Sequence, residues 1–399
     1  MFVSETHLPQ LLPPEAYHDV TWYRREIDRV LRPSWWAVAA LDELPRDGSF
    51  VTFDHVDGPV ILRRSGGSIR GYRNVCPHRL AKLTGRARGV CATLTCGYHG
   101  WQFDDSGATR RIPDAPSFRP LEKGQLGLDV LRVETVGGIV FLTFDPAAPP
   151  VRQWLGDEAE RIDERFGPRT RTLHRVDIDI PVNWKLVVEN NLESYHVSIV
   201  HAATLGGYPD EAACRHDLAP GRSRFTGPGG STAWTRLRIA LARMLGRVTG
   251  GQYTHTIVHP AFTWLCVDLL SGFQSIVPTG PRSCRMTVRF GALQAESPRA
   301  VADRAARLAM AGELQFWKRV IAEDLAVLPQ VQAGVESPRH PGAGLISRRE
   351  ERIVHFQRWL LEQLGIDPAG REAETLVPTP ARTLPAGPTT HRRHQEQVT

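Results

Sequence analysis

Two cysteines and two histidines with short spacing stand out in CPHRLAKLTGRARGVCATLTCGYHGW, residues 76–101. His78 follows Cys76 after one residue, and His99 follows Cys96 after two, with seventeen residues between the pairs. Two thiolates and two imidazoles can hold a tetrahedral zinc ion, and they are also the ligand set of a Rieske-type [2Fe–2S] cluster. The stretch therefore predicts a metal centre, and its surroundings must decide which one.

The arrangement of the two pairs favours the cluster over zinc. Each pair lies in a tight loop, CPHR or CGYHGW, so two facing loops would each offer one thiolate and one imidazole. A zinc finger more often uses a Cys-x₂-Cys pair and a His-x₃₋₅-His pair. Trp101 directly follows the second loop and could shield the cluster from water. We therefore predict Cys76, His78, Cys96 and His99 as ligands of a [2Fe–2S] cluster.

A second group of polar side chains lies in PVNWKLVVENNLESYHVSIVH, residues 181–201. Its apolar residues, which include Tyr195 and Ile199, have helical spacing, and His196 and His201 lie within or beside that stripe. Five residues turn a straight helix by about 140° past one full turn. Both imidazoles therefore reach one metal ion only if the helix loosens or ends between them. A lone His-x₄-His pair is more often two buried histidines with hydrogen-bond partners, so the pair alone does not decide.

Together, the two stretches resemble the α subunits of the Rieske non-haem iron oxygenases, the ring-hydroxylating oxygenase family. Residues 181–201 are similar to the family's mononuclear-iron motif, N-W-K…E-N-x-x-[DE]-x-Y-H-x₄-H. The resemblance implies His196 and His201 as iron ligands. It also implies a carboxylate ligand in a pattern like E-D-x₅-Q, which EDLAVLPQ fits, with Asp324 as the ligand. Glu323 would then lie on an exposed helix face.

The resemblance implies a terminal oxygenase that uses O₂ and two electrons from NAD(P)H to hydroxylate a small organic substrate. Two imidazoles and one carboxylate leave positions open on the mononuclear Fe(II), and the cluster supplies the electrons. A separate reductase, with or without a ferredoxin, would deliver them. A chain of this size without a fused reductase resembles the homotrimeric members, many of which are monooxygenases. We therefore expect a monooxygenase or demethylase.

The family also implies a head-to-tail homotrimer, in which the cluster of one subunit lies close to the iron of the next. A bridging acid joins the two centres, and the matching position, three residues before His196, holds Glu193. Many members have Asp there. Glu occurs in the branch that acts on quaternary ammonium compounds such as carnitine, which inclines our expectation toward that branch. The other role open to Glu193 is to orient an imidazole within one subunit.

Two other functions remain open. An aromatic-ring cis-dihydroxylating dioxygenase would use the same motifs, and nothing in them separates it from a monooxygenase. A Rieske electron-transfer protein with a non-catalytic C-terminal domain would not need the second group of ligands. The dioxygenase would differ from the expected monooxygenase in its product. The electron-transfer protein would differ from it in iron content.

Composition limits the class of protein. With 399 residues, 41% of them hydrophobic and 23% charged, the chain is expected to form two globular domains. The sequence contains no apolar run long enough for a transmembrane helix. Its polar, Pro-rich N-terminal residues do not resemble a signal peptide, so we expect a cytoplasmic protein. The net charge of +6 would allow a basic patch that binds an acidic electron-transfer partner. The arginines do not cluster with aromatic residues as in nucleic-acid-binding proteins.

Strand and helix patterns predict an α+β chain: an all-β Rieske [2Fe–2S] domain and a helix-grip-like catalytic domain whose antiparallel sheet is covered by helices. We predict an N-terminal arm and helix over 1–33 that pack with the catalytic domain. The Rieske domain would span 34–147, the mononuclear-iron domain 148–370, and a disordered tail 371–399.

Three details of the catalytic domain follow from local patterns. Residues 203–250 are rich in Gly and Arg, and we expect loops there with a short helix near 235–245. A long helix is expected over 299–327, ended by Pro329. Residues that could line a substrate pocket, although such residues are more often core, are Leu205, Tyr208, Trp234, Tyr253, Phe262 and Trp264.

Overall fold

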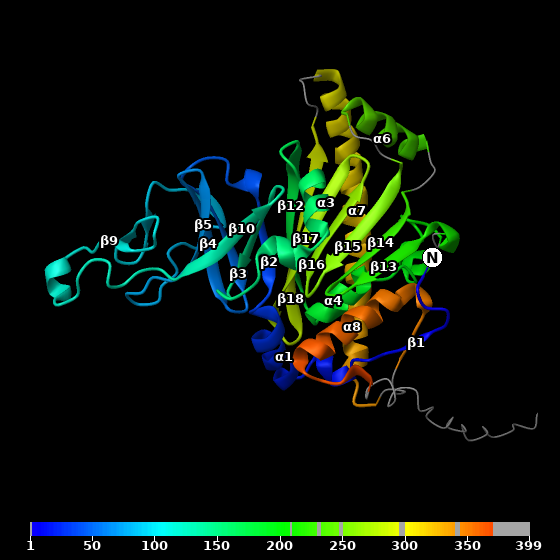
Figure 1. Cartoon of the computed structure of the whole chain (residues 1–399), viewed down its shortest axis with the longest axis horizontal. Coiled ribbons are helices and arrows are strands. Elements are labelled where there is room, and N and C mark those ends of the chain that lie inside the picture. The colour runs from blue at the N-terminus through cyan, green and yellow to red at the C-terminus, as the bar shows by residue number, and fades with distance from the viewer. Residues whose placement is uncertain are drawn as a thin grey trace, which may run out of the picture.

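The computed structural model describes residues 2–207, 210–229, 233–246, 250–294, 300–339 and 344–369. Two seven-stranded antiparallel sheets form two domains, with the smaller domain at one end of the molecule (Figure 1). This confirms the predicted α+β fold class. The predicted tail, 371–399, lies outside the described residues. Among the helices that are described, none combines the length and the apolar character needed to cross a bilayer.

The N-terminal domain is built on a sheet with strand order β2-β11-β10-β5-β4-β3-β6. A separate three-stranded sheet, β7-β8-β9, adjoins the predicted cluster loops. Gly66 and Gly67 both have positive φ, as a two-residue type I′ hairpin turn between β4 and β5 requires. The strands are β2 Trp35–Ala40, β3 Ser49–His55, β4 Gly58–Ser65, β5 Ser68–Arg73, β6 Arg88–Val90, β7 Leu94–Thr95, β8 Gln102–Phe103, β9 Thr109–Arg111, β10 Val130–Val136 and β11 Ile139–Thr143.

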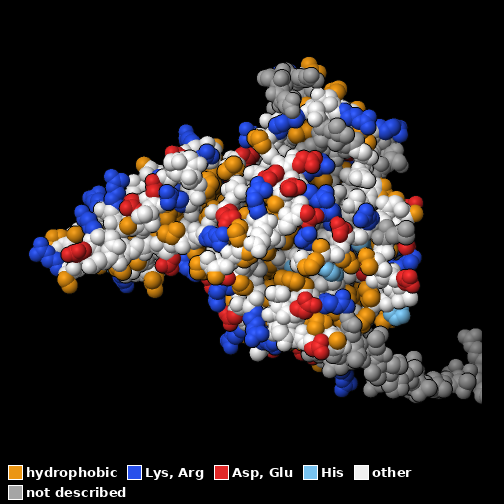
Figure 2. All heavy atoms as spheres, viewed as in Figure 1, with side chains coloured by type: hydrophobic (Ala, Val, Ile, Leu, Met, Phe, Trp, Pro, Cys, Tyr) orange, Lys and Arg blue, Asp and Glu red, His pale blue; other side chains and the backbone are white. Residues whose placement is uncertain are grey.

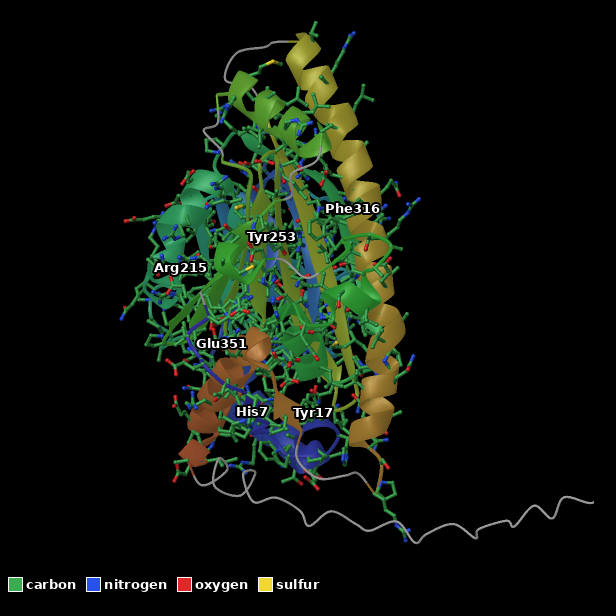
Figure 3. The ribbon with its side chains drawn as sticks, turned by 90° about the vertical axis from the view of Figure 1, so that its right-hand side faces the viewer. His7, Tyr17, Arg215, Tyr253, Phe316 and Glu351 are labelled. Carbon is green, nitrogen blue, oxygen red and sulfur yellow. The ribbon has the colours of Figure 1, made fainter. Side chains whose placement is uncertain are left out.

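The second domain is built on an antiparallel sheet with strand order β12-β18-β17-β16-β15-β14-β13. Helices α4, α7 and α8 contact this sheet, and α7 runs along it (Figures 1 and 3). The strands are β12 Thr170–Ile180, β13 Arg215–Ala219, β14 Arg222–Pro228, β15 Gln252–Val258, β16 Phe262–Val267, β17 Leu270–Gly280 and β18 Ser283–Leu293. The helices of this domain are α2 Val151–Leu155, α3 Glu158–Arg165, α4 Trp184–Asn191, α5 Val197–Val200, α6 Ala233–Met244, α7 Ala300–Val335 and α8 Glu351–Leu364.

The N-terminal arm packs against the second domain. Its strand β1, Leu8–Pro9, pairs with β19, Leu345–Ile346, and its helix α1, Val20–Glu26, continues into a π-helical turn, Ile27–Leu31. Asp19 caps α1 by accepting hydrogen bonds from the amides of Thr21 and Trp22. The 3₁₀ turns of the chain are Pro14–Tyr17, Leu41–Glu43, Ala115–Phe118, Glu211–Ala213 and Arg348–Glu350.

The predicted end of the long helix is wrong. Helix α7 continues through Pro329 to Val335. Proline removes one backbone hydrogen bond from a helix, but packing beyond it can outweigh that loss. Here Leu328 is buried, and Gln332 accepts a hydrogen bond from the amide of Asn183 at 2.8 Å. These contacts hold the last two turns in place.

The loop prediction for 203–250 is also wrong in part. Strands β13 and β14 form a hairpin there, turned at Gly221 (φ 70°), and β14 pairs with β15 along its whole length. The short helix α6 is present, as expected near 235–245. The hairpin contains Asp217, Gly227 and Pro228, residue types that are depleted in strands, so its pairing with β15 decides its conformation.

The two faces of the second sheet have different neighbours. One face packs against α2, α3 and strands β2 and β11 of the N-terminal domain, in a shared core that includes Trp35, Phe141, Phe262 and Trp264. The other face is covered by helices and leaves room for a cavity. Successive side chains of a strand point to opposite faces, so β15, β16 and β17 contribute both to the domain interface and to the cavity.

Candidate functional site

The two predicted cluster loops have the same backbone geometry. In the first loop, the amide of Leu80 donates to the carbonyl of Cys76 at 3.0 Å, and in the second the amide of Gly100 donates to the carbonyl of Cys96 at 3.0 Å. Leu80 (φ 59°) and Gly100 (φ 73°) both lie in the left-handed region, which leucine rarely adopts. Two different sequences therefore close the same turn around a cysteine.

The loops bring all four predicted ligands together. The thiols of Cys76 and Cys96 are buried and form no disulfide. Burial raises the pKa of Cys76 to about 11, and the nearby Cys96 thiol adds to this rise. The rings of His78 and His99 lie 4.6 Å apart between centroids, and the buried Trp101 stacks on His78 at 5.1 Å. Two inner thiols and two outer imidazoles fit a [2Fe–2S] cluster with cysteines on one iron and histidines on the other.

His196, His201 and Asp324 face one another in the second domain. One potential ligand atom from each lies within 4.8 Å of the other two. Asp324 Oδ1 is 3.4 Å from His196 Nε2 and 3.0 Å from His201 Nε2, yet it accepts no well-aligned hydrogen bond. Buried oxygens normally have a hydrogen-bond partner. The arrangement therefore fits a cation held between the three side chains.

The backbone reaches this arrangement by breaking the helix earlier than the sequence suggests. Helix α4 ends at Asn191, and His196 and His201 directly precede and follow the single turn α5. The break rotates the later residues away from the expected buried stripe, and Tyr195 and Ile199 are exposed. A single turn between the histidines brings their rings to 5.0 Å between centroids.

Each imidazole is held through its other nitrogen by its own carboxylate. His196 Nδ1 hydrogen-bonds Glu193 Oε1, and His201 Nδ1 donates to Glu323 Oε2 at 2.7 Å. Glu323 also accepts from Thr204 Oγ1 at 2.6 Å. With Nδ1 engaged as the donor, Nε2 of each ring is the nitrogen that would bind a metal ion beside Asp324, after giving up its proton. Glu323 therefore contacts a predicted iron ligand, whereas the sequence suggested only an exposed position on the helix. Glu193 orients an imidazole of its own subunit.

The charges at this site suit a cation. Burial lowers the pKa of His196, but Asp324 and Glu193 outweigh burial and raise it to about 10. Burial raises the pKa of Asp324, but the two imidazoles and Asn190 outweigh the effect of burial. The pKa of Asp324 therefore lies below its usual range. The carboxylates thus stabilise positive charge between the imidazoles. Two histidines and one carboxylate are a ligand set of non-haem Fe(II).

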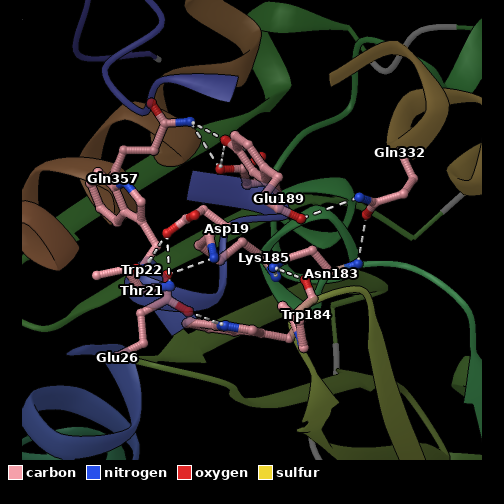
Figure 4. Close-up of polar contacts among 12 residues, drawn as sticks. Asp19, Thr21, Trp22, Glu26, Asn183, Trp184, Lys185, Glu189, Gln332 and Gln357 are labelled. Atoms are coloured by element: carbon pink, nitrogen blue, oxygen red, sulfur yellow. Dashed lines mark hydrogen bonds and ion pairs between the residues drawn. The ribbon is translucent and has the colours of Figure 1, made fainter. Parts of the chain in front are cut away.

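A buried ion pair fixes the first turn of α4 (Figure 4). Lys185 Nζ donates to Glu26 Oε1 at 2.6 Å, and neither side chain is exposed. Trp184 Nε1 donates to the other oxygen of Glu26 at 2.9 Å. The pair therefore ties the helix that leads to the metal ligands to helix α1 of the N-terminal arm.

The last turn of α4 is fixed by a second set of polar contacts. Glu189 Oε1 accepts hydrogen bonds from Tyr17 Oη at 2.8 Å and from Gln357 Nε2 at 2.9 Å. Tyr17 belongs to the N-terminal arm, and Gln357, which Figure 4 labels, belongs to α8. Burial raises the pKa of Glu189 to about 7. Helix α4 is thus held by elements from both ends of the chain.

A cavity of about 770 Å³ opens beside the three facing side chains. Its wall is mostly apolar and comes from the sheet, α6, α7 and the first turn of α8. Tyr253 of β15 stacks on Trp317 of α7, with centroids 5.9 Å apart. Figure 3 shows Tyr253 on the sheet and Phe316 on α7, with Glu351 at the start of α8 below them. The cavity is large enough for a small organic molecule.

The sequence identified some of the cavity residues and misplaced others. Leu205 and Tyr253 line the cavity. Phe262 and Trp264 pack instead in the core between the domains. Leu265, next to Trp264 on β16, lines the cavity, because neighbouring residues of a strand point to opposite faces. Tyr208 and the side chain of Trp234 lie outside the described part of the chain.

Two family models match the chain. Residues 34–130 match the Rieske [2Fe–2S] domain. Residues 168–366 match the ring hydroxylating alpha subunit (catalytic domain). The four cysteine and histidine residues of the loops lie within the first match, and the three facing residues within the second.

Curated relatives include two kinds of oxygenase. Choline monooxygenase of Atriplex hortensis is 24% identical over 375 residues, which cover 89% of this chain and 78% of that protein. The anthranilate 1,2-dioxygenase large subunit of Burkholderia cepacia is 32% identical over 216 residues, which cover 50% of each chain. Among solved structures, a quaternary ammonium Rieske monooxygenase has the same fold, with a TM-score of 0.74 and 20% identity over 90% of this chain and 95% of that one.

Proposed function

This chain belongs to the Rieske non-haem iron oxygenases and is a terminal oxygenase component, and we propose that it acts as a monooxygenase on a small organic substrate. Where the hydroxylated carbon is an N- or O-methyl group, loss of formaldehyde demethylates the substrate. The cofactors of the family are a Rieske [2Fe–2S] cluster and a mononuclear iron. We assign the cluster to Cys76, His78, Cys96 and His99, and the iron to His196, His201 and Asp324.

The observation that carries this proposal is the facing of His196, His201 and Asp324 at the edge of the cavity. An electron carrier with a non-catalytic second domain would need neither these side chains nor the cavity. A metal hydrolase would not need the two cluster loops. An oxygenase needs both groups of residues in one chain.

When bound, the cluster and the mononuclear iron would supply electron transfer and O₂ activation, and the protein supplies the geometry. Glu193 and Glu323 fix the ring orientation of the two imidazoles and keep Nε2 of each as the ligand atom. Asn190 contacts Asp324 and supports its ionised form. The apolar wall limits water around the substrate and positions one of its carbons near the three ligands.

The choice of monooxygenase rests on two observations. Similarity to choline monooxygenase extends over 89% of the chain. Glu193 also stands at the position where the resemblance associates Glu with quaternary ammonium substrates. The second candidate is a ring cis-dihydroxylating dioxygenase, which the higher identity of 32% to the anthranilate dioxygenase subunit over half of the chain favours.

We also propose that electrons cross between subunits of a homotrimer. The cluster loops adjoin the small sheet β7-β8-β9 at the far end of the molecule from α4 (Figure 1). A cluster so placed would lie closer to the iron of a neighbouring subunit, with Glu193 of that subunit as the bridge. Glu193 Oε1 contacts His196 Nδ1, and Oε2 accepts hydrogen bonds from the amides of Tyr195 and His196. A cluster histidine of the neighbour would contact a remaining lone pair of this carboxylate.

A separate reductase would supply the electrons, either directly or through a ferredoxin that carries them from the reductase to this protein. Basic side chains gather on the N-terminal domain, on the face that Figure 2 shows. The exposed ones between positions 70 and 123 are Arg70, Arg79, Lys82, Arg86, Arg88, Arg110, Arg111, Arg119 and Lys123. This surface suits an acidic redox partner, whose binding would weaken as salt increases.

Product analysis tests the proposed reaction. The purified protein would be supplied with a surrogate reductase, NADH, O₂ and a pool of N-methyl, O-methyl and unsubstituted aromatic compounds. Formaldehyde together with a product lighter by one CH₂ identifies a demethylating monooxygenase. Addition of two oxygens and two hydrogens without formaldehyde identifies the dioxygenase instead.

Iron analysis tests the assigned ligands. The protein should hold about three iron atoms per chain, two in the cluster and one at the mononuclear site. His196→Ala should leave about two, keep the cluster spectrum and abolish turnover. His174→Ala, on β12 and outside the cavity, is the control and should keep all three. Turnover that survives His196→Ala would contradict the assignment.

A further inference from the structure

Two arginine side chains line the cavity, and they differ in their counter-ions. Arg238 Nη1 donates to Glu313 Oε1 at 2.8 Å, and its Nε lies 3.6 Å from Asp268 Oδ2. Arg352 is only 2% exposed, yet within the described part of the chain it forms no ion pair with any carboxylate. The cavity therefore contains one arginine with acidic partners and one without.

The contacts of Arg352 are all to neutral groups. Its Nε donates to Ser223 Oγ at 3.0 Å, and its Nη2 donates to the carbonyl of Ser223 at 3.2 Å. Nη2 also lies 3.4 Å from both Nδ1 and the carbonyl oxygen of His255. Nη1 has no hydrogen-bond partner among the described residues. The protein thus holds the guanidinium in place but leaves its charge uncompensated and one nitrogen available.

The neighbouring acid, Glu351, is engaged elsewhere. Its carboxylate accepts hydrogen bonds from the amides of Val3 and Ser4 at 2.8 and 2.6 Å, and it pairs with His216 Nδ1 at 2.7 Å. It therefore serves the N-terminal arm instead of neutralising Arg352.

The surrounding groups also stay neutral. Burial, together with the positive charge of Arg352, lowers the pKa of His255 to about 3. Burial lowers the pKa of Arg352 itself to about 9, since only the Tyr253 phenol opposes that effect. A buried cation without a counter-ion is costly, and buried charges in proteins are normally paired, so an anionic ligand would supply what Arg352 lacks.

Building on the function proposed above, we propose that the substrate is a small carboxylate whose anionic group binds Arg352. A single uncompensated charge matches a monoanion. A carboxylate also suits a guanidinium better than any neutral acceptor, because both hydrogen bonding and charge favour the pair. Arg352 is thus a specificity-determining residue of the cavity.

The position of Arg352 relative to the iron ligands gives the substrate an orientation. Tyr253 lines the same cavity as both sites and is close enough to feel both charges: burial raises its pKa, the charge of Arg352 opposes this rise, and the charge of Asp324 adds to it. Figure 3 shows Tyr253 above Glu351, the residue that precedes Arg352. A carboxylate bound at Arg352 would place the rest of the molecule along the Tyr253 and Trp317 rings, with its far end toward Asp324.

Equilibrium binding tests the proposal without turnover. Calorimetry would use the anaerobic, iron-loaded protein without reductase, with benzoate against benzamide and 4-methoxybenzoate against 4-methoxybenzamide. Each pair differs in charge and hardly in shape. Since a hydrogen bond to a charged group contributes about 1.5–3 kcal/mol, each acid should bind about ten- to a hundredfold more tightly than its amide.

Arg352→Met should remove this preference, so that acid and amide bind equally. Its melting temperature without ligand should stay near that of the wild type, because the variant loses a buried charge that had no partner. Arg352→Lys is the second variant: it keeps a charge at this position and should retain part of the preference. Arg289→Lys is the control, since Arg289 is also buried but pairs with Glu43 at 2.6 Å outside the cavity. It should keep the full preference.

Equal binding of acid and amide by the wild type, or binding of neither acid, would overturn the proposal, as would a preference that survives Arg352→Met. This result is separate from the proposed monooxygenase activity. An acid preference in a protein that never oxygenates a substrate would contradict that activity alone. Turnover of neutral substrates without an acid preference would contradict only the role of Arg352.

Discussion

The two candidate metal centres of this chain are built in opposite ways. The four cluster residues lie within residues 76–101, on two loops that close with their own backbone hydrogen bonds. The three iron residues lie between positions 196 and 324, and the helix before them is fixed by residues from both ends of the chain. The first centre is a local structure, whereas the second depends on the fold of the whole second domain.

The imidazoles of the two centres also differ in how far the surrounding protein holds them. Within the described part of the chain, His78 and His99 have no carboxylate partner, while His196 and His201 each have one on Nδ1 and share Asp324 on Nε2. His99 is also exposed, whereas His201 is buried. An imidazole without an internal partner can accept one from outside, which agrees with the proposed contact to a neighbouring subunit. The comparison predicts that changes in the helix network affect the iron site and spare the cluster.

The largest effect is expected from Lys185→Met, which leaves Glu26 buried without its counter-ion. Loss of one partner of a buried pair typically costs about 3–5 kcal/mol. The free energy of unfolding of the second domain should fall by that amount, and mononuclear iron should be lost with it. Denaturation followed by fluorescence, with iron analysis, measures both. The visible circular dichroism of the cluster should be unchanged.

The double variant Lys185→Met/Glu26→Met is the matched control for this prediction. It removes both charges, so its stability should lie between those of the single variant and the wild type. A single variant as stable as the wild type, or one that loses its cluster together with its iron, would break the comparison between a local and a global centre.

The pH dependence of stability should come next in size and should depend on Glu189. Burial raises the pKa of this carboxyl from 4.5 to about 7. The folded protein then keeps a proton that the unfolded chain releases between about pH 4.5 and 7, so this contribution is complete below that range and lost as pH rises through it. The loss is at most about 3 kcal/mol, from 1.36 kcal/mol for each unit of pKa.

Glu189→Gln should remove this slope, because glutamine has no proton to release and still accepts a hydrogen bond from Tyr17 Oη. Urea denaturation of both proteins between pH 4.5 and 7.5 measures the difference. A variant with the same slope as the wild type would assign the pH dependence to other groups. Cluster bleaching should follow neither curve, since the cluster loops do not contact this network.

The sequence predicts local structure better than structure that depends on the whole domain, as the two centres show. Spacing alone indicated the cluster residues, because their positions depend only on two short turns. The α+β class followed from strand and helix patterns. Pro329 and the β13–β14 hairpin were misjudged because tertiary packing overrode local preference: Gln332 holds the helix beyond the proline, and β15 pairs with an Arg-rich strand.

The sequence also missed Glu323, for a physical reason. Adjacent residues of a helix differ in direction by about 100°, so a pattern that makes Asp324 a ligand places Glu323 on another face. The pattern cannot reveal that α5 ends at Val200, directly before His201, and that the Nδ1 of the His201 ring turns toward Glu323. Recognising that a metal-binding histidine usually has a carboxylate partner would have made Glu323 a candidate.

The smallest expected effect, and the sharpest test of the comparison, is that of Glu323→Gln. Glutamine keeps an acceptor for His201 Nδ1 but removes the negative charge, so affinity for mononuclear iron should fall about ten- to a hundredfold. Titration of the iron-free protein with Fe(II) measures the affinity. Glu336→Gln, one residue after the end of α7 and paired with Arg282 at 3.3 Å, is the control and should leave the iron affinity unchanged. Glu193→Gln should weaken iron binding to a similar extent, because Glu193 orients the imidazole of His196. Since Glu193 is also the proposed bridge, this variant should in addition slow electron transfer from the cluster in a single turnover. If both variants slowed that transfer equally, Glu193 would only orient its imidazole, and the difference between the two carboxylates would disappear.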